Sequence, residues 1–128
     1  MVVAEIPPKF TCERVRDLAR AHFGLALTQV TDLVSYDDQN LLGVDAAGTR
    51  YVLKLANSRE RRLPLEAQHA MLQHLAHTRP ALTLPRPVVN ADGGEICEVL
   101  SDEGHTHLFR VLTFLEGRFL AEVESKSS

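Results

Sequence analysis

The first periodic pattern of apolar residues lies near the N-terminus and has the spacing of a helix. Its members recur three and four positions apart on one face: Val15, Leu18, Ala19, His22 and Phe23. Gly24 follows, at a position where a helix end can turn left-handed at little steric cost. The pattern therefore predicts a helix that begins at Thr11 or Cys12 and covers residues 11–23.

From about position 29 the pattern changes to short apolar runs separated by polar turns, which is typical of strands. The runs predict three strands, near residues 29–33, 41–45 and 50–55. The turn at residues 45–48 is short and contains glycine, so it favours an antiparallel hairpin between the second run and the third.

A second helix is predicted to begin near Pro64, because proline is tolerated in a first helical turn, where its missing N–H would have no partner. Its apolar stripe would be formed by residues at heptad-like spacing: Leu65, Gln68, Leu72 and Leu75. The same segment carries His69, His74 and His77. We interpret these histidines as a solvated helix face, because too few ligands at suitable spacing are present to hold zinc.

The last predicted elements are a second hairpin and a final strand. Residues 88–90 and 95–100 would pair across a turn at 92–94, and residues 108–114 are apolar on both strand faces, as in a buried strand. The order is helix, three strands, helix, and two or three more strands. Because tight turns join most strands, we expect an α+β fold in which an antiparallel sheet carries the helices on one face.

Composition narrows the class of protein. The chain has 128 residues, 45% of them hydrophobic and 24% charged, which is typical of a single globular domain. The formal net charge of −3 provides no basic surface for nucleic acid or for an anionic membrane. We expect neither a transmembrane segment nor a secretory signal. Cys12 and Cys97 form no paired motif, so we interpret them as free thiols of a cytoplasmic protein and leave its oligomeric state open.

Lys54 is the first candidate for chemistry. It shares a strand face with two small apolar residues, Val52 and Ala56, so it is either a snorkelling surface lysine or a fixed cation that clamps a phosphate. Glu66 is its candidate partner, at the border of the second helix's apolar stripe. The helix dipole would also favour a glutamate in this first turn without any partner. Residue types and spacing leave both alternatives open.

The loop at residues 35–40, Ser-Tyr-Asp-Asp-Gln-Asn, precedes the second predicted strand and contains no glycine. Phosphate-binding loops cradle their ligand with backbone N–H groups. Asp37 and Asp38 would repel a phosphate if their carboxylates faced it. We therefore expect them to accept hydrogen bonds from N–H groups of their own loop and to set its shape. The alternative interpretation is an ordinary polar hairpin tip.

The order of these features resembles that of protein-kinase-like folds. The strand that ends in Lys54, followed by Leu-Glu-Ala-Gln-His at residues 65–69, is similar to the strand-three lysine and helix-C glutamate of such folds. Residues 35–40 and 110–117 resemble the aminoglycoside phosphotransferase superfamily, and within it the hydroxylysine kinases most of all. The resemblance covers residues 10–122, nearly the whole chain.

The resemblance implies a particular domain organisation. Residues 1–122 would form a kinase-like N-terminal nucleotide-binding lobe, with a helix at 11–23 and a five-stranded antiparallel sheet and second helix within 29–115. The helices would pack beside the sheet. Residues 123–128 would be a polar tail.

The same resemblance implies a nucleotide site. Lys54 would clamp the phosphates of GTP or ATP, Glu66 would orient Lys54, and Ser35 with neighbouring backbone would cover the phosphates. Val52 would form part of the roof over the base. The base edge would bond to the backbone of a hinge made of Leu112, Thr113, Phe114 and Leu115.

Phosphoryl transfer also needs a carboxylate for the acceptor hydroxyl and ligands for Mg²⁺. In the family these come from a second lobe with a His-Gly-Asp loop and a metal motif, and neither motif occurs here. We therefore expect the N-lobe of a small-molecule kinase that phosphorylates 5-hydroxylysine or a similar amino-acid-like substrate. The chain would be truncated before the catalytic lobe, would hold no catalytic residue or metal ligand, and would be inactive alone. The alternative is a non-catalytic lobe that binds a nucleotide or a protein, or a truncated isoform that competes with the full enzyme.

Overall fold

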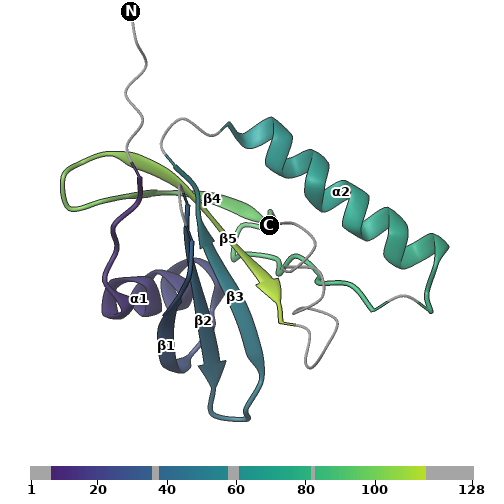
Figure 1. The fold of residues 1–128 in the computed structure, drawn as a ribbon, viewed down its shortest axis with the longest axis horizontal. Helices are drawn as coiled ribbons and strands as arrows, with labels where there is room; N and C mark the ends of the chain where they lie inside the picture. Colours follow the sequence, from purple (N-terminus) through teal and green to yellow (C-terminus); the bar gives the residue numbers. More distant parts are fainter. Residues whose placement is uncertain (1–6, 36–37, 58–60, 82, 115–128) are drawn as a thin grey trace, which may run out of the picture.

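The protein is described here by a computed structural model that covers residues 7–35, 38–57, 61–81 and 83–114 (Figure 1). The elements in chain order are α1 (Cys12–Phe23), β1 (Leu27–Leu33), β2 (Gln39–Asp45), β3 (Arg50–Leu55), α2 (Arg62–Thr78), β4 (Ile96–Leu100) and β5 (Thr106–Thr113). The strands form one five-stranded sheet in the order β1-β2-β3-β5-β4, and every neighbouring pair is antiparallel. Within the described ranges, neither helix has the length and apolarity that crossing a membrane requires.

Helix α1 begins and ends where its capping residues predict. The Thr11 side chain accepts a hydrogen bond from the backbone N–H of Arg14 at 3.0 Å, which satisfies one of the unpaired donors of the first turn. Gly24 ends the helix with a φ of 67°, a left-handed conformation that costs glycine little. The predicted helix at 11–23 is therefore confirmed, including its buried face.

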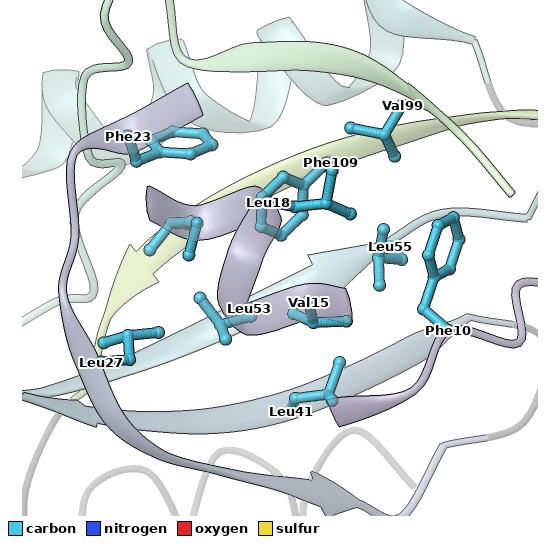
Figure 2. Packing of buried hydrophobic residues seen from close by; sticks show 12 residues of the cluster. Phe10, Val15, Leu18, Phe23, Leu27, Leu41, Leu53, Leu55, Val99 and Phe109 are labelled. Carbon is cyan, nitrogen blue, oxygen red and sulfur yellow. The ribbon is translucent and has the colours of Figure 1, made fainter. Parts of the chain in front are cut away.

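The hydrophobic core lies between α1 and one face of the sheet. Figure 2 shows Val15 and Leu18 of α1 packed over the strands, where Leu53, Leu55 and Phe109 are fully buried. These strand residues share a face because antiparallel register pairs Leu55 with Phe109 and side chains alternate along each strand. Burying each such side chain contributes about 1.5–3 kcal/mol.

Gly43 of β2 is needed for this packing. A Cβ at position 43 would lie 2.8 Å from Leu27 Cδ1 and 3.2 Å from Leu53 Cδ1. A larger residue would therefore push two core leucines away from the centre of the sheet.

The hairpin between β2 and β3 has the predicted turn. The Asp45 carboxylate accepts hydrogen bonds from the N–H groups of Ala47 and Thr49 at 3.0 and 2.9 Å, and Asp45 O accepts the N–H of Gly48 at 3.0 Å. Strand β3 has the predicted bounds, whereas β1 and β2 each begin two residues before their apolar runs.

A smaller cluster on the opposite face holds α2. Leu65 of α2 packs with Ala56, Ile96 and Leu108, which point away from the α1 core. The prediction that both helices share one face is therefore wrong, although the α+β class and the five-stranded antiparallel sheet are confirmed. The reason is strand alternation, since Ile96 and Leu108 point to one face while their neighbours Cys97 and Phe109 point to the other.

The stripe predicted for helix α2 is confirmed in part. Leu65 is buried and Leu72 and Leu75 are half-buried, but Gln68 is exposed and His69 is buried in its place. The interpretation of His69 as solvated is therefore wrong, whereas His74 and His77 are exposed as expected. The buried face is set by the sheet beneath it, where a charged partner described below accommodates the imidazole.

The predicted strand at residues 88–90 is also wrong. Instead, Pro87 forms an isolated antiparallel bridge with Leu112, and the N–H of Val88 donates to Val111 O at 2.8 Å. Strand β4 pairs with β5. Prolines at 85 and 87 lack the N–H groups that a regular ladder needs, which explains the irregular path.

Candidate functional site

A row of polar side chains crosses the centre of the sheet on the face opposite α1. Antiparallel register places Asn40 of β2 beside Lys54 of β3, and Lys54 beside Arg110 of β5. Lys54 Nζ donates a hydrogen bond to Asn40 Oδ1 at 3.3 Å. Arg110 is 9% exposed. We call this side of the sheet the Lys54 face.

An apolar row lies next to the polar row on the same face. Leu42, Val52 and Leu112 are cross-strand neighbours in β2, β3 and β5, one alternation step along from Asn40, Lys54 and Arg110. Leu112 is buried, while Leu42 and Val52 are half-buried. The sheet therefore offers an apolar surface adjacent to a lysine. This arrangement can hold a flat ring beside an anionic group.

The loop that precedes β2 is tied to the protein through its own polar side chains. Asp38 Oδ1 accepts the backbone N–H of Asn57 at 3.0 Å, and Ser35 Oγ accepts the N–H of Asn40 at 3.4 Å. The Asp38 carboxylate thus accepts a backbone hydrogen bond, as expected. The donor is Asn57, which lies just after β3 and not in the loop of Asp38. Asp37 lies outside the described residues.

Gln39 is an anchor that the sequence did not point to. Its side-chain oxygen accepts the N–H of Phe10 at 2.8 Å, and its side-chain nitrogen donates to Phe10 O at 2.7 Å and to Asp32 Oδ1 at 3.1 Å. Gln39 and Asn40 are adjacent in β2 and therefore point to opposite faces. One side chain ties the loop to the segment before α1, and the other contacts Lys54.

Glu66 lies on the same side of the sheet as Lys54, because α2 packs on the Lys54 face through Leu65. Between these two described residues the structure has no ion pair, and Glu66 is exposed. The expected direct contact is therefore absent here, because Leu65 and His69 occupy the buried side of α2 and Glu66 falls on its flank. The role of Glu66 in the site stays a prediction.

The link between α2 and the sheet is a buried chain of polar contacts that the sequence did not reveal. Arg110 Nη1 lies 3.1 Å from His69 Nε2, and His69 Nδ1 lies 3.2 Å from Glu95 Oε1. The Gln73 side chain donates to the other Glu95 oxygen. Burial lowers the pKa of His69, and the Arg110 charge lowers it further, against the opposing influence of Glu95 and Glu66.

The predicted hinge uses much of its hydrogen-bonding capacity within the chain. The N–H of Thr113 donates to Arg86 O at 2.9 Å, and the Thr113 hydroxyl accepts the N–H of Arg86 at 2.8 Å. The N–H of Phe114 donates to Arg50 O at 3.1 Å. A base edge would therefore meet carbonyl oxygens here, or Leu115, which lies outside the described residues.

The family assignment comes from the sequence. Residues 30–127, most of the chain, match the phosphotransferase enzyme family. The chain belongs to this phosphotransferase family. The match includes the loop before β2, the Lys54 strand, α2 and β5, so the candidate site lies within it. The predicted resemblance to the aminoglycoside phosphotransferase superfamily is confirmed.

Three hydroxylysine kinases are similar to this phosphotransferase-family chain over nearly all of its length. The identity is 31% with that of Mus musculus, over 94% of the chain and 35% of the relative. It is 31% with that of Danio rerio, over 96% and 36%, and 30% with that of Bos taurus, over 91% and 34%. The chain therefore spans about a third of the length of these relatives.

A solved structure has the same fold. The amicoumacin kinase hAmiN, in complex with AMP-PNP, Ca²⁺ and Ami, superposes with a TM-score of 0.71 over 85% of this chain and 32% of the kinase. Sequence identity is 21%. The likeness confirms the kinase-like fold predicted for this phosphotransferase-family chain.

Proposed function

We propose that residues 1–122 form the nucleotide-binding lobe of a small-molecule kinase, with ATP or GTP bound on the Lys54 face. The observation that carries the proposal is the adjacency of two rows, the polar row with Lys54 and the apolar row with Val52 and Leu112. A nucleotide has the same division, since a flat apolar base is joined to charged phosphates. The lobe binds the base against the apolar row and the phosphates at Lys54.

Lys54 suits the phosphate end of this site. A lysine ammonium is a compact cation, and β3 is a central strand that fixes its origin. The Asn40 amide oxygen orients the ammonium without itself bringing a negative charge. Ser35, whose hydroxyl accepts the N–H of Asn40, covers the phosphates together with neighbouring backbone. Glu66, on the flank of α2, supports Lys54 when the nucleotide is bound.

The other end of the site binds the base. Val52 and Leu112 supply the roof, and the hinge from Leu112 through Thr113 and Phe114 to Leu115 supplies polar backbone at the base edge. The structural relative supports this assignment, since it was solved with AMP-PNP. Among the described residues no group of three or more His, Cys, Asp or Glu side chains could hold a metal ion.

The sequence relatives support a proposal for the acceptor. Hydroxylysine kinases align with this chain along nearly its whole length, from two mammals and a fish. We therefore assign the lobe to a kinase that transfers a phosphoryl group from GTP or ATP to the hydroxyl of 5-hydroxylysine or a similar amino acid.

Replacing Lys54 with methionine tests the nucleotide site. The variant keeps the aliphatic stem and removes the charge, so we expect the affinity of the 128-residue chain for Mg–ATP and Mg–GTP to fall about fivefold to tenfold, as for loss of one charge-assisted contact. Isothermal titration calorimetry measures the affinity, and the thermal shift caused by each nucleotide provides a second readout.

Lys9→Met is the matched control, because Lys9 is the other lysine among the described residues and is exposed in the segment before α1. It should leave both readouts unchanged. A folded wild-type chain that neither nucleotide stabilises would contradict the proposal and favour the alternative of a non-catalytic lobe that binds a protein.

The chain by itself should not catalyse transfer. Phosphoryl transfer needs a carboxylate at the acceptor hydroxyl and metal ligands. The 128 residues span about a third of the length of the hydroxylysine kinases and do not contain the His-Gly-Asp sequence that the resemblance associates with catalysis. We expect no phosphorylated 5-hydroxylysine above background when the pure chain is incubated with Mg–GTP or Mg–ATP and analysed by mass spectrometry. Product that forms with wild type and disappears with Lys54→Met would refute this expectation.

A further inference from the structure

The chain of contacts between β5 and α2 has a geometry that defines where its protons are. Arg110 can only donate, so His69 Nε2 must accept at the 3.1 Å contact. The proton of the neutral ring is then on Nδ1, where it faces Glu95 Oε1 at 3.2 Å. The imidazole therefore fits its two neighbours only as one tautomer of the neutral form. We call Arg110, His69 and Glu95 the latch.

Among the described residues, the apolar contact between α2 and the sheet is small. Leu65 and His69 are the buried residues of α2, and Leu65 packs against a cluster of three residues, Ala56, Ile96 and Leu108. The N-cap residue Arg61 makes no side-chain capping bond, although Arg62 Nη1 donates to Ile96 O at 2.8 Å. Since His69 is 1% exposed, the latch lies at the centre of the helix–sheet contact.

The latch is connected to the proposed nucleotide site through two residues, Lys54 and Glu66. Arg110 is the cross-strand neighbour of Lys54, so the latch begins in the polar row itself. Glu66 lies one helical turn before His69 on α2, so a shift of the helix at His69 moves Glu66 as well. The latch thus connects the helix that carries Glu66 to the strand beside Lys54.

We propose that Arg110 and His69 are positioning residues that hold α2 over the nucleotide site, and that protonation of His69 opens this latch and weakens nucleotide binding. This inference rests on the proposed function, because it concerns the regulation of the same site.

The charges around His69 determine the direction of the effect. A proton on Nε2 would place an N–H against the Arg110 guanidinium, which breaks the hydrogen bond and adds like-charge repulsion. Glu95, from the turn before β4, and Glu66, from α2 itself, oppose this effect, but burial and Arg110 outweigh them and keep the His69 pKa below its ordinary value of 6.5. The unfolded chain therefore binds this proton more readily. The latch contributes its full stability above about pH 6.5 and loses it as the pH falls through the pKa of the folded state.

His69→Gln separates positioning from protonation. The glutamine amide offers both an acceptor for Arg110 and a donor for Glu95 but does not titrate. Mg–ATP affinity is measured by calorimetry at about pH 7.5 and about pH 5.5 for wild type, His69→Gln and the control His74→Gln, an exposed histidine on the same helix. The nucleotide phosphate also titrates in this range. The quantity compared between variants is therefore a ratio, the affinity at the higher pH divided by the affinity at the lower pH.

We expect this ratio to be about twofold to threefold larger for wild type and His74→Gln than for His69→Gln, because only the first two carry an imidazole at position 69 that can take up a proton between the two pH values. Equal ratios for wild type and His69→Gln would overturn the inference. Two measurements on the nucleotide-free chain are made alongside. Urea denaturation at the same two pH values should show that wild type loses more stability on acidification than His69→Gln, and the NMR titration of wild type should give His69 a pKa below its ordinary value of 6.5.

These measurements distinguish the two levels of failure. In one outcome, no nucleotide binds at either pH, but the stability difference and the NMR titration are as expected. The proposed function and the effect of the latch on affinity are then both refuted, whereas the structural role of the latch is supported. If His69 titrates at or above its ordinary pKa of 6.5, the latch fails even where Lys54-dependent nucleotide binding is found. The NMR arm uses the wild-type chain, so it holds even if His69→Gln does not fold.

Discussion

Replacing Phe109 with alanine is expected to lower the free energy of unfolding by about 3–5 kcal/mol, the range for removing a fully buried phenylalanine. Phe109 is 0% exposed in β5, and its ring meets that of Phe23 edge-on with 5.4 Å between centroids (Figure 2). Because small domains have a total stability of about 5–15 kcal/mol, the loss is a large fraction of the whole. Urea denaturation of the 128-residue chain, followed by circular dichroism, measures it.

Leu100→Ala is the matched control. Leu100 lies in the neighbouring strand β4 and is 56% exposed, so its truncation should change stability by no more than about 0.5 kcal/mol. If the two variants were equally stable, Phe109 would not be at the centre of the core. The comparison also matters for the site, since β5 carries Phe109 on one face and Arg110 and Leu112 on the other.

The elements that the sequence predicted well are those with local determinants. Thr11 and Gly24 define both ends of α1 through their own conformations, and residues 45–48 close the β2–β3 hairpin with bonds inside the turn. Strand alternation correctly separated Lys54 and Val52 from the core residues Leu53 and Leu55. Such features depend on near neighbours, so a single sequence is sufficient to recognise them.

The features that the sequence did not predict depend on distant partners. His69 can be buried in the helix–sheet contact because its ring nitrogens contact Arg110, 41 positions away, and Glu95. The local spacing of residues in α2 does not indicate these partners. The segment at 88–90 was predicted to pair with residues 95–100, but the N–H of Val88 donates instead to Val111 O of β5, beyond the part of β5 that pairs with β4. In both cases tertiary contacts override the local pattern.

The candidate site was predicted unevenly for the same reason. Alternation and register bring Lys54, Val52 and Leu112 onto one face, while the roles that the resemblance implies for them stay predictions. Glu66 lies on the right side of the sheet but makes no ion pair with Lys54, because the rotation of α2 about its axis is set by Leu65 and His69. Such a rotation comes from packing and cannot be derived from the position of one glutamate in a helix.

The loop before β2 carries acidic residues, which would repel a phosphate if their carboxylates faced it. Replacing Asp38 tests the role of this loop in nucleotide binding. Asp38→Ala removes a negative charge near the proposed phosphate position, so simple electrostatics would strengthen nucleotide binding. The structure predicts the opposite, because Asp38 Oδ1 accepts the N–H of Asn57 at 3.0 Å and ties the loop to the end of β3. We expect affinity for Mg–ATP to fall about tenfold and the free energy of unfolding to fall by about 1–3 kcal/mol, as for loss of a hydrogen bond to a charged group.

Asp38→Asn separates charge from anchoring. It removes the same charge, but its amide oxygen can still accept the N–H of Asn57, so its affinity should lie between those of wild type and Asp38→Ala. The exposed Asp102, in the loop between β4 and β5, provides a charge control through Asp102→Ala, which should leave affinity unchanged. If both Asp38 variants bound Mg–ATP equally and more tightly than wild type in calorimetry, the carboxylate would act on the nucleotide through its charge. The loop would then owe its shape to Ser35 and Gln39, whose hydrogen bonds do not involve Asp38.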